Sequence, residues 1–201
     1  MKKYLLILIL LLLISSLSSC KKFDKEDKDN LYAQIILNNN DKINLKLDYN
    51  NAPKTVDNFI KLCEEEFYND MIFHRIISGF MIQGGGFYLK DDKPVNKSAS
   101  KIVGEFSENG HINKIKHELG VISMARATDP DSASSQFFIC SAKTSSLDGK
   151  YAAFGKATDQ KSLEVIVKIS HVETYYYNDY FQDYPVKPVI IKTIKLANKQ
   201  F

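Results

Sequence analysis

Short apolar runs separated by turn-forming residues limit the possible folds of this chain more than any other feature. Runs of strand length occupy residues 32–37, 43–47, 71–77, 80–83, 102–106, 119–125, 136–141, 152–155 and 189–196. Only two stretches, within residues 53–67 and 162–169, repeat apolar residues at helical spacing. Strands and helices do not alternate as they do in a parallel α/β fold. The pattern therefore predicts a mainly β chain, either a closed antiparallel barrel or a sandwich, with two helices.

The boundaries of two elements carry specific signals. Pro53 follows Asn51, which is typical of a helix whose first turn is capped. Three consecutive glycines, residues 84–86, follow the run at Phe80–Gln83, and we expect them to end that strand in a turn. They lack the spacing of a phosphate-binding loop. Irregular chain is expected from there to about Lys101.

The first twenty residues have the composition of a targeting segment. MKK gives a positive start, and residues 4–14 form an unbroken apolar run of eleven residues. That run is shorter than the roughly 20 residues of a membrane-spanning helix, but it fits the core of a signal peptide. LSSC, residues 17–20, resembles the lipobox of bacterial lipoproteins, in which the chain is cut before a lipidated cysteine. We expect a signal peptide over residues 1–19 and a lipidated Cys20, with an ordinary secreted protein as the alternative.

The segment after Cys20 is almost entirely charged. KKFDKEDKDN, residues 21–30, holds one aromatic residue and cannot bury enough apolar surface to fold. We expect residues 20–30 to form a flexible tether and residues 31–198 to form the folded domain. Without Lys2 and Lys3 the chain has 27 − 2 = 25 basic and 24 acidic residues, so no concentrated basic face and no nucleic-acid partner are expected.

Cysteine and histidine positions indicate neither a metal site nor a required disulfide. Cys63 and Cys140 have apolar neighbours, which favours two buried free thiols, although a disulfide outside the cytoplasm stays open. The four histidines show no zinc-binding pair spacing. The Asp129–Asp131 loop is typical of a turn rather than a calcium site, and a serine-hydrolase elbow is absent. We therefore expect no metal and no cofactor.

The stretch FHRIISGFMIQGGGF, residues 73–87, places an arginine inside an apolar run. Of 27 basic residues only Arg75 and Arg126 are arginines. An arginine that persists in such a lysine-rich chain suggests a need for a planar, permanently charged group of donors, which lysine lacks. A salt-bridged arginine on a barrel surface is the alternative.

Together with the segment from Gly120 to Ala157, this stretch resembles the cyclophilin-type peptidyl-prolyl cis-trans isomerases. The matching pieces are FHRII-x-GFM-x-QGG, SMA, SQFFI and LDGK-xxx-FGK, in that order, and the resemblance covers about residues 32–198. It implies a closed eight-stranded antiparallel β-barrel capped by two α-helices. It also implies an isomerase that acts on proline-containing unfolded or partly folded proteins in a groove on the outer face of the barrel.

The resemblance also implies the residues of that groove. The catalytic positions would be Arg75, Phe80 and Gln83. The substrate-binding positions would be Met81, Ala125, Gln136, Phe138, Leu147 and Tyr151. Three positions depart from the best-known eukaryotic pattern: Ser146 stands where a tryptophan donates its indole N–H to cyclosporin, Tyr151 replaces a histidine and Arg126 replaces an asparagine.

The implied reaction needs no acid, base, nucleophile or metal. An X-Pro bond rotates slowly, in roughly 10–100 s, because amide resonance stiffens it. At the twisted transition state the amide is less polar and the prolyl nitrogen regains a lone pair. A dry apolar wall that includes Phe80, Met81 and Phe138 would receive the proline ring, and Arg75 would donate to the nitrogen. We expect Gln83 to hold the guanidinium of Arg75.

These observations lead us to expect a monomeric, lipid-anchored isomerase outside the cytoplasm. A non-catalytic peptide-binding or scaffold module of the same fold is the alternative, and the intact Arg75 and Gln83 weigh against it. A solute-binding lipoprotein would need two lobes, for which 201 residues are too few. The tyrosine-rich stretch Glu173–Pro185 could be a packed surface loop or an aromatic patch that binds a partner.

Overall fold

A closed antiparallel barrel of eight strands forms the centre of the molecule in the computed structural model, which describes residues 23–201. The strand bounds are Tyr32–Leu37 (β1), Lys42–Leu47 (β2), Met71–Ile77 (β3), Met81–Lys90 (β4), Lys93–Asn96 (β5), Val121–Met124 (β6), Phe137–Cys140 (β7), Ala153–Ala157 (β8) and Val189–Ala197 (β11). The order around the barrel is β3, β11, β1, β2, β8, β6, β7 and β4, and β4 pairs with β3 to close it. Strand β5 extends β4 as an outer hairpin. The predicted eight-stranded barrel is confirmed.

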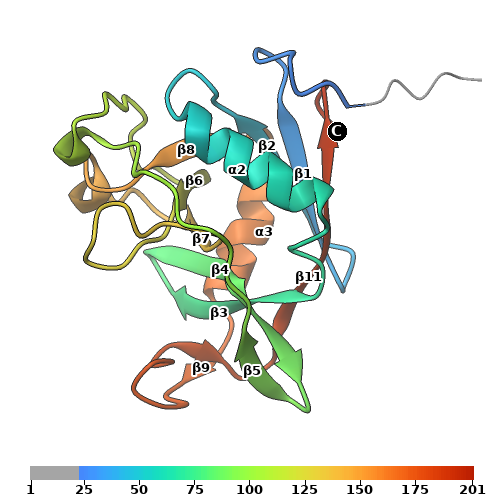
Figure 1. The fold of residues 1–201 in the computed structure, drawn as a ribbon. Helices are drawn as coiled ribbons and strands as arrows, with labels where there is room; N and C mark the ends of the chain where they lie inside the picture. Colours follow the sequence, from blue (N-terminus) through green and yellow to red (C-terminus); the bar gives the residue numbers. More distant parts are fainter. Residues whose placement is uncertain (1–22) are drawn as a thin grey trace, which may run out of the picture.

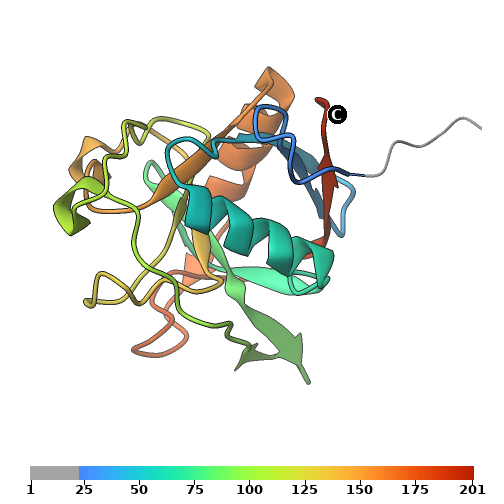
Figure 2. The ribbon, with the colours of Figure 1, turned by 45° about the horizontal axis from the view of Figure 1, so that its top comes forward.

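Two α-helices within the described residues cover this barrel. Helix α2 spans Pro53–Glu64 and helix α3 spans Gln160–Ser170. Figures 1 and 2 show α2 in front of the strands and α3 behind it. Both helices bury apolar residues, among them Phe59 and Ile166, in the same core as the inward-facing residues of the strands. The ring of Phe59 lies 5.2 Å from that of Phe154 and 5.3 Å from that of Tyr68.

The first turn of α2 is satisfied by a distant side chain rather than by Asn51. The N-cap residue is Ala52, which has no side chain able to cap. The carboxyl oxygens of Glu105 accept from the backbone N–H groups of Lys54 at 3.0 Å and Thr55 at 2.7 Å. Glu105 is only 2% exposed, so its charge complements the positive end of the helix dipole in a buried position. The helix begins at Pro53 as expected, but Glu105 rather than Asn51 accepts from its first backbone N–H groups.

Strand β4 continues through the three glycines that were expected to end it. Contacts from neighbouring chain explain why glycine is needed there: a Cβ at Gly86 would lie 2.5 Å from Gln136, and one at Gly85 would lie 2.8 Å from the carbonyl oxygen of Ser135. The expected strand at 102–106 is reduced to a single bridge between Ile102 and Ala133. Strand β5 occupies part of the stretch that was expected to be irregular.

The charged segment packs on the domain over the residues that the structure describes. Phe23 packs against the core, and Asn198 donates to the backbone carbonyl of Asp24 at 2.7 Å. Lys28 lies 3.5 Å from a carboxyl oxygen of Asp57 and 4.1 Å from the centre of the Tyr49 ring. Residues 23–30 therefore do not behave as the free tether that their composition predicts. The expected signal peptide, residues 1–19, and Cys20 lie outside the described residues.

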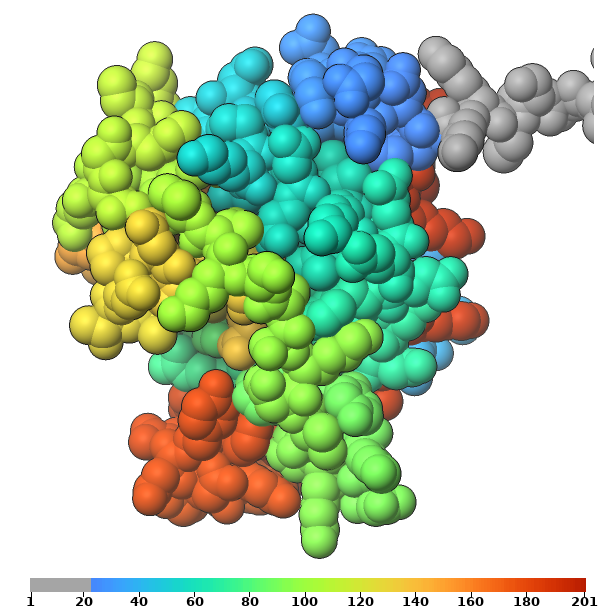
Figure 3. Space-filling model, in the orientation of Figure 1, coloured from blue at the N-terminus to red at the C-terminus, as the bar shows by residue number. Residues whose placement is uncertain are grey.

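The tyrosine-rich loop, residues 173–185, contains two very short strands, β9 (Thr174–Tyr175) and β10 (Tyr184–Pro185). In Figures 1 and 3 it lies beside the β4–β5 hairpin as a projection at one end of the molecule. Phe181 and Tyr184 are buried against Ile72 and Phe87, whereas Tyr176 and Tyr180 are more than half exposed. The loop thus has a packed base and an aromatic outer surface. None of the helices in the described part of the chain is long and apolar enough to cross a membrane.

Candidate active site

A separate apolar cluster lies on the outer face of the barrel where β4 pairs with β7. Met81, Phe138 and Cys140 are buried in this cluster, which does not belong to the main core. The intervening residues Ile82 and Ile139 point into the barrel and are completely buried in that core. Because successive side chains of a strand point to opposite faces, the two paired strands present one apolar row on each side.

The outer cluster forms one wall of a small groove of about 120 Å³. Its lining residues are Arg75, Phe80, Met81, Gln83, Ala125, Arg126, Phe138, Leu147 and Tyr151. An adjoining cavity of about 250 Å³ shares Gln83, Ala125 and Arg126 with it and is completed in part by Gln136 and Tyr180. The structure therefore brings all nine predicted site residues to one surface. Ser146 is exposed in the 3-10 turn at Ser145–Leu147 and does not line the groove.

Arg75 lies at the edge of the groove with its side chain 43% exposed. It stands opposite Gln83 in the β3–β4 ladder, but the amide of Gln83 donates to Oε1 of Gln136 at 3.0 Å. The group that contacts the guanidinium is Asp183, whose Oδ2 lies 3.4 Å from Nε of Arg75. The expectation that Gln83 holds Arg75 is therefore wrong in this structure. Sequence reasoning missed Asp183, which lies 108 positions from Arg75.

The wall formed by Phe138 is supported from both sides. Its ring makes an edge contact with Tyr151 at 5.5 Å and stacks on His117 at 5.9 Å. His117 is buried and is hydrogen bonded to Asp148 and to the hydroxyl of Ser123, each at 3.1 Å. Burial lowers the pKa of His117 although the hydrogen bond to Asp148 opposes the shift. A neutral, fixed imidazole thus backs the Phe138 ring, a role that its sequence position did not suggest.

Arg126 also lines the groove. Its guanidinium lies 5.0 Å from the centre of the Tyr151 ring and 4.9 Å from that of Phe106. Its Nε donates to the carbonyl oxygen of Lys150 at 3.1 Å. Arg75, by contrast, is not stacked on an aromatic ring, and its one side-chain hydrogen bond among the described residues involves Nε. Its Nη groups can therefore donate to a ligand.

The groove offers apolar walls and two arginines, of which Arg126 already donates to backbone carbonyl oxygens. Cys63 and Cys140 are buried free thiols, as favoured from the sequence, and burial raises the pKa of Cys140 to about 11. The thiol beneath the groove is thus protonated at neutral pH and a poor nucleophile. Over residues 23–201, no three His, Cys, Asp or Glu side chains are grouped so as to hold a metal ion. The arrangement suits binding and distortion of an apolar peptide segment.

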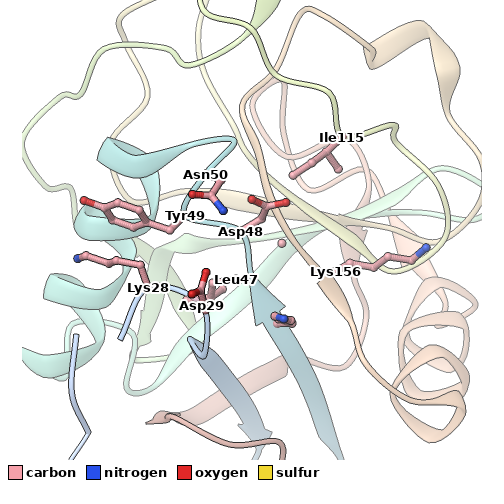
Figure 4. Close-up of a pocket in the computed structure, with 10 residues that line it drawn as sticks. Lys28, Asp29, Leu47, Asp48, Tyr49, Asn50, Ile115 and Lys156 are labelled. Atoms are coloured by element: carbon pink, nitrogen blue, oxygen red, sulfur yellow. The ribbon is translucent and has the colours of Figure 1, made fainter. Parts of the chain in front are cut away.

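A larger cavity of about 370 Å³ lies elsewhere and shares no residue with the groove. Figure 4 shows that Lys28, Asp48, Tyr49 and Lys156 border it, near the N-terminal segment and strand β2. Three of its charged residues have protein partners: Lys28 pairs with Asp57, Lys156 pairs with Glu118, and Asp48 accepts from Asn51. Because five of its ten lining residues are charged and none is a predicted site residue, we assign the peptide site to the smaller groove.

Sequence similarity to known proteins shows the family of this chain. The model of the family described as "Cyclophilin type peptidyl-prolyl cis-trans isomerase/CLD" matches residues 32–196. The chain belongs to this family. Among curated relatives, "Peptidyl-prolyl cis-trans isomerase A" of Dickeya dadantii is 43% identical over 162 residues, covering 78% of this chain and 80% of that protein. "Peptidyl-prolyl cis-trans isomerase B" of Escherichia coli is 38% identical over 154 residues, covering 73% of this chain and 88% of that protein.

A solved cyclophilin has the same fold. The crystal structure of a cyclophilin type peptidyl-prolyl cis-trans isomerase of Cryptosporidium parvum, determined in the presence of the dipeptide Ala-Pro, superposes with a TM-score of 0.65. It is 26% identical and covers 83% of this chain and 98% of that chain. The chain is therefore a cyclophilin and an isomerase of peptidyl-prolyl bonds, whose substrates are proline-containing polypeptides.

Proposed function

We propose that this cyclophilin is a lipid-anchored, monomeric isomerase that assists protein folding outside the cytoplasm and uses Arg75 as its catalytic donor. The observation that carries the catalytic part is the position of Arg75 beside an apolar groove on the outer barrel face. A guanidinium is a planar group of donors and can direct two Nη groups at one ligand atom.

In this proposal the groove stabilises the twisted amide in two ways. Phe80, Met81, Phe138 and Leu147 surround the proline ring and exclude water from the rotating bond. Loss of resonance makes the amide less polar, so a dry environment favours the twisted state over the planar one. Arg75 donates a hydrogen bond to the prolyl nitrogen, which has a free lone pair only in the twisted state. An interaction made only there raises the rate of rotation.

The size of the second effect follows from the exposure of Arg75. A hydrogen bond that involves a charged group contributes about 1.5–3 kcal/mol. At about 1.36 kcal/mol per tenfold change, that corresponds to roughly 10- to 150-fold in rate. The side chain of Arg75 is 43% exposed, so the lower part of this range applies.

The remaining site residues bind the polypeptide in this proposal. Ala125 and Tyr151 line the groove, and Gln136 lines the adjoining cavity. Gln83 contacts the amide of Gln136 rather than the guanidinium. The polypeptide chain would therefore cross both the groove and the adjoining cavity. An extended segment flanking the proline fits this arrangement better than a compact ligand does.

The anchor is proposed from the order of features in residues 1–30. A positive start, an apolar run, LSSC and a charged segment follow one another, as in bacterial lipoproteins. A diacylated cysteine satisfies the requirement of two chains for stable membrane attachment. In a cell that processes lipoproteins, Cys20→Ser should release the protein from the membrane fraction or stall its processing, with unchanged activity per molecule. Normal processing and unchanged membrane fractionation of Cys20→Ser would refute the anchor.

A non-catalytic peptide-binding module of the same fold is the second candidate, and a rate measurement separates the two. A protease-coupled assay with an Ala-Pro or Leu-Pro peptide measures cis-to-trans conversion above the uncatalysed rate. The proposal predicts acceleration that grows linearly with protein concentration. Binding of the peptide without any acceleration would support the module instead.

A further inference from the structure

The tyrosine-rich loop brings a carboxyl group to the catalytic arginine. Asp183 Oδ2 lies 3.4 Å from Nε of Arg75, and both side chains are partly shielded, with exposures of 36% and 43%. Among the described residues, Asp183 is the only one that hydrogen bonds to the Arg75 guanidinium. The contact joins a loop near the C-terminus to strand β3, at the edge of the groove.

The loop holds Asp183 in place through both its backbone and its neighbours. The N–H of Ile76, the residue after Arg75, donates to the carbonyl oxygen of Asp183 at 3.0 Å. Tyr184 begins β10, which pairs with β9 at the other end of the loop. Phe181 and Tyr184 are 7% and 5% exposed in a cluster with residues of β3 and β4. The buried residues Phe181 and Tyr184, which flank Asp183 in the sequence, therefore hold its carboxyl group beside Arg75.

The geometry has a specific consequence for the guanidinium. A guanidinium is rigid and planar, and its Nε–H and its two Nη groups donate in different directions within that plane. A carboxyl group at Nε restricts rotation of the whole plane and leaves the Nη groups for a ligand. Correct orientation of a catalytic donor affects the rate strongly, because a small misplacement weakens an interaction made only in the transition state.

We propose that Asp183 is a positioning residue that orients Arg75 toward the prolyl nitrogen. This inference rests on the proposed catalytic role of Arg75. It gives the tyrosine-rich loop a function that neither sequence alternative included, since the loop completes the donor side of the active site. A partly exposed ion pair contributes little to folding stability, so the effect of Asp183 should appear in catalysis rather than in unfolding.

The test compares Asp183→Asn with a control in the same loop. Asp179→Asn is the control, because Asp179 accepts from the hydroxyl of Tyr176 and has no contact with Arg75. We expect Asp183→Asn to lower kcat about fivefold, with KM within about twofold and the thermal midpoint within about 2 °C of the parent. Asp179→Asn should keep the parent kcat, and Asp183→Glu, which retains the charge, should recover at least half of the loss.

A double-mutant cycle with Arg75→Lys separates positioning from a general effect of the loop. In the Arg75→Lys background, Asp183→Asn should change kcat by less than about twofold, because the planar fork is already absent. An equal loss in both backgrounds, or parent-like activity of Asp183→Asn, would overturn the inference. If Arg75→Lys itself keeps parent activity, the catalytic role of Arg75 fails, and that outcome is distinct from failure of Asp183 alone.

Discussion

Acid should destabilise this protein through one buried histidine next to Arg75. His74 is 3% exposed, and its ring lies 4.7 Å from that of Phe87 and 6.1 Å from that of Phe181. Its Nδ1 is buried and has no hydrogen-bond partner among the described residues. Burial is the main cause that lowers the pKa of His74 from 6.5 to about 4, and the neighbouring charge of Arg75 acts in the same direction.

The sign and size of the effect follow from this shift. The unfolded chain takes up a proton on His74 near pH 6.5, whereas the folded chain does so only near pH 4. Between these values the unfolded state binds more protons, so the free energy of unfolding falls as the pH falls. The full shift corresponds to about 3 kcal/mol, and about 2.5 kcal/mol of it should be lost by pH 4.5.

Urea unfolding of the parent and His74→Phe at pH 7.5 and pH 4.5 measures this contribution. Phenylalanine suits the aromatic surroundings and cannot titrate, and the carboxyl groups common to both proteins cancel in the comparison. The parent should lose about 2.5 kcal/mol more than His74→Phe over this range. His171→Asn, at an exposed histidine, should behave like the parent. If the parent and His74→Phe lose the same amount within about 0.5 kcal/mol, the reasoning is refuted.

Two further predictions concern cyclosporin inhibition and the capping of helix α2. The resemblance implies that Ser146 stands where the family has a tryptophan, and a chain without tryptophan offers no other indole donor. The parent should therefore bind cyclosporin weakly, and Ser146→Trp should tighten inhibition about tenfold with catalysis retained. Nanomolar inhibition of the parent, or no gain in Ser146→Trp, would show that this position does not act as the tryptophan position does. Glu105→Gln should lower the free energy of unfolding, measured by urea denaturation, by about 2 kcal/mol, because a buried anion at the start of α2 is lost. The control is Glu108→Gln at an exposed position, which should change this free energy by less than about 0.5 kcal/mol. A loss below about 0.5 kcal/mol in Glu105→Gln would contradict the capping role.

The strands could be predicted because they depend on local patterns, whereas the closed barrel and the groove positions were implied by the resemblance to cyclophilins. Short apolar runs indicate most barrel strands, and the resemblance carried by the quoted motifs implies that Arg75, Phe80 and Phe138 share one surface. What local patterns could not supply were partners distant in the chain. Asp183 at the guanidinium and Glu105 at the α2 N-terminus lie 108 and 50 positions from the groups that they contact. Only the closed barrel brings them together.

The glycines of β4 also depend on contacts with a distant part of the chain, which local patterns do not reveal. Read locally, three glycines end a strand, since glycine favours turns. In the fold, the chain around Ser135 and Gln136 approaches β4 so closely that larger residues would clash, and the strand continues. A close approach between distant segments is not visible in a single sequence.

The most direct test of the account is the catalytic rate of Arg75→Lys. Lysine keeps the positive charge, so the thermal midpoint should change little, but it lacks the planar pair of donors. In the protease-coupled assay with an Ala-Pro peptide, kcat/KM should fall at least about tenfold, as expected for the loss of one charged hydrogen bond in the transition state. A value within about twofold of the parent, which corresponds to roughly 0.4 kcal/mol, would contradict the role of Arg75.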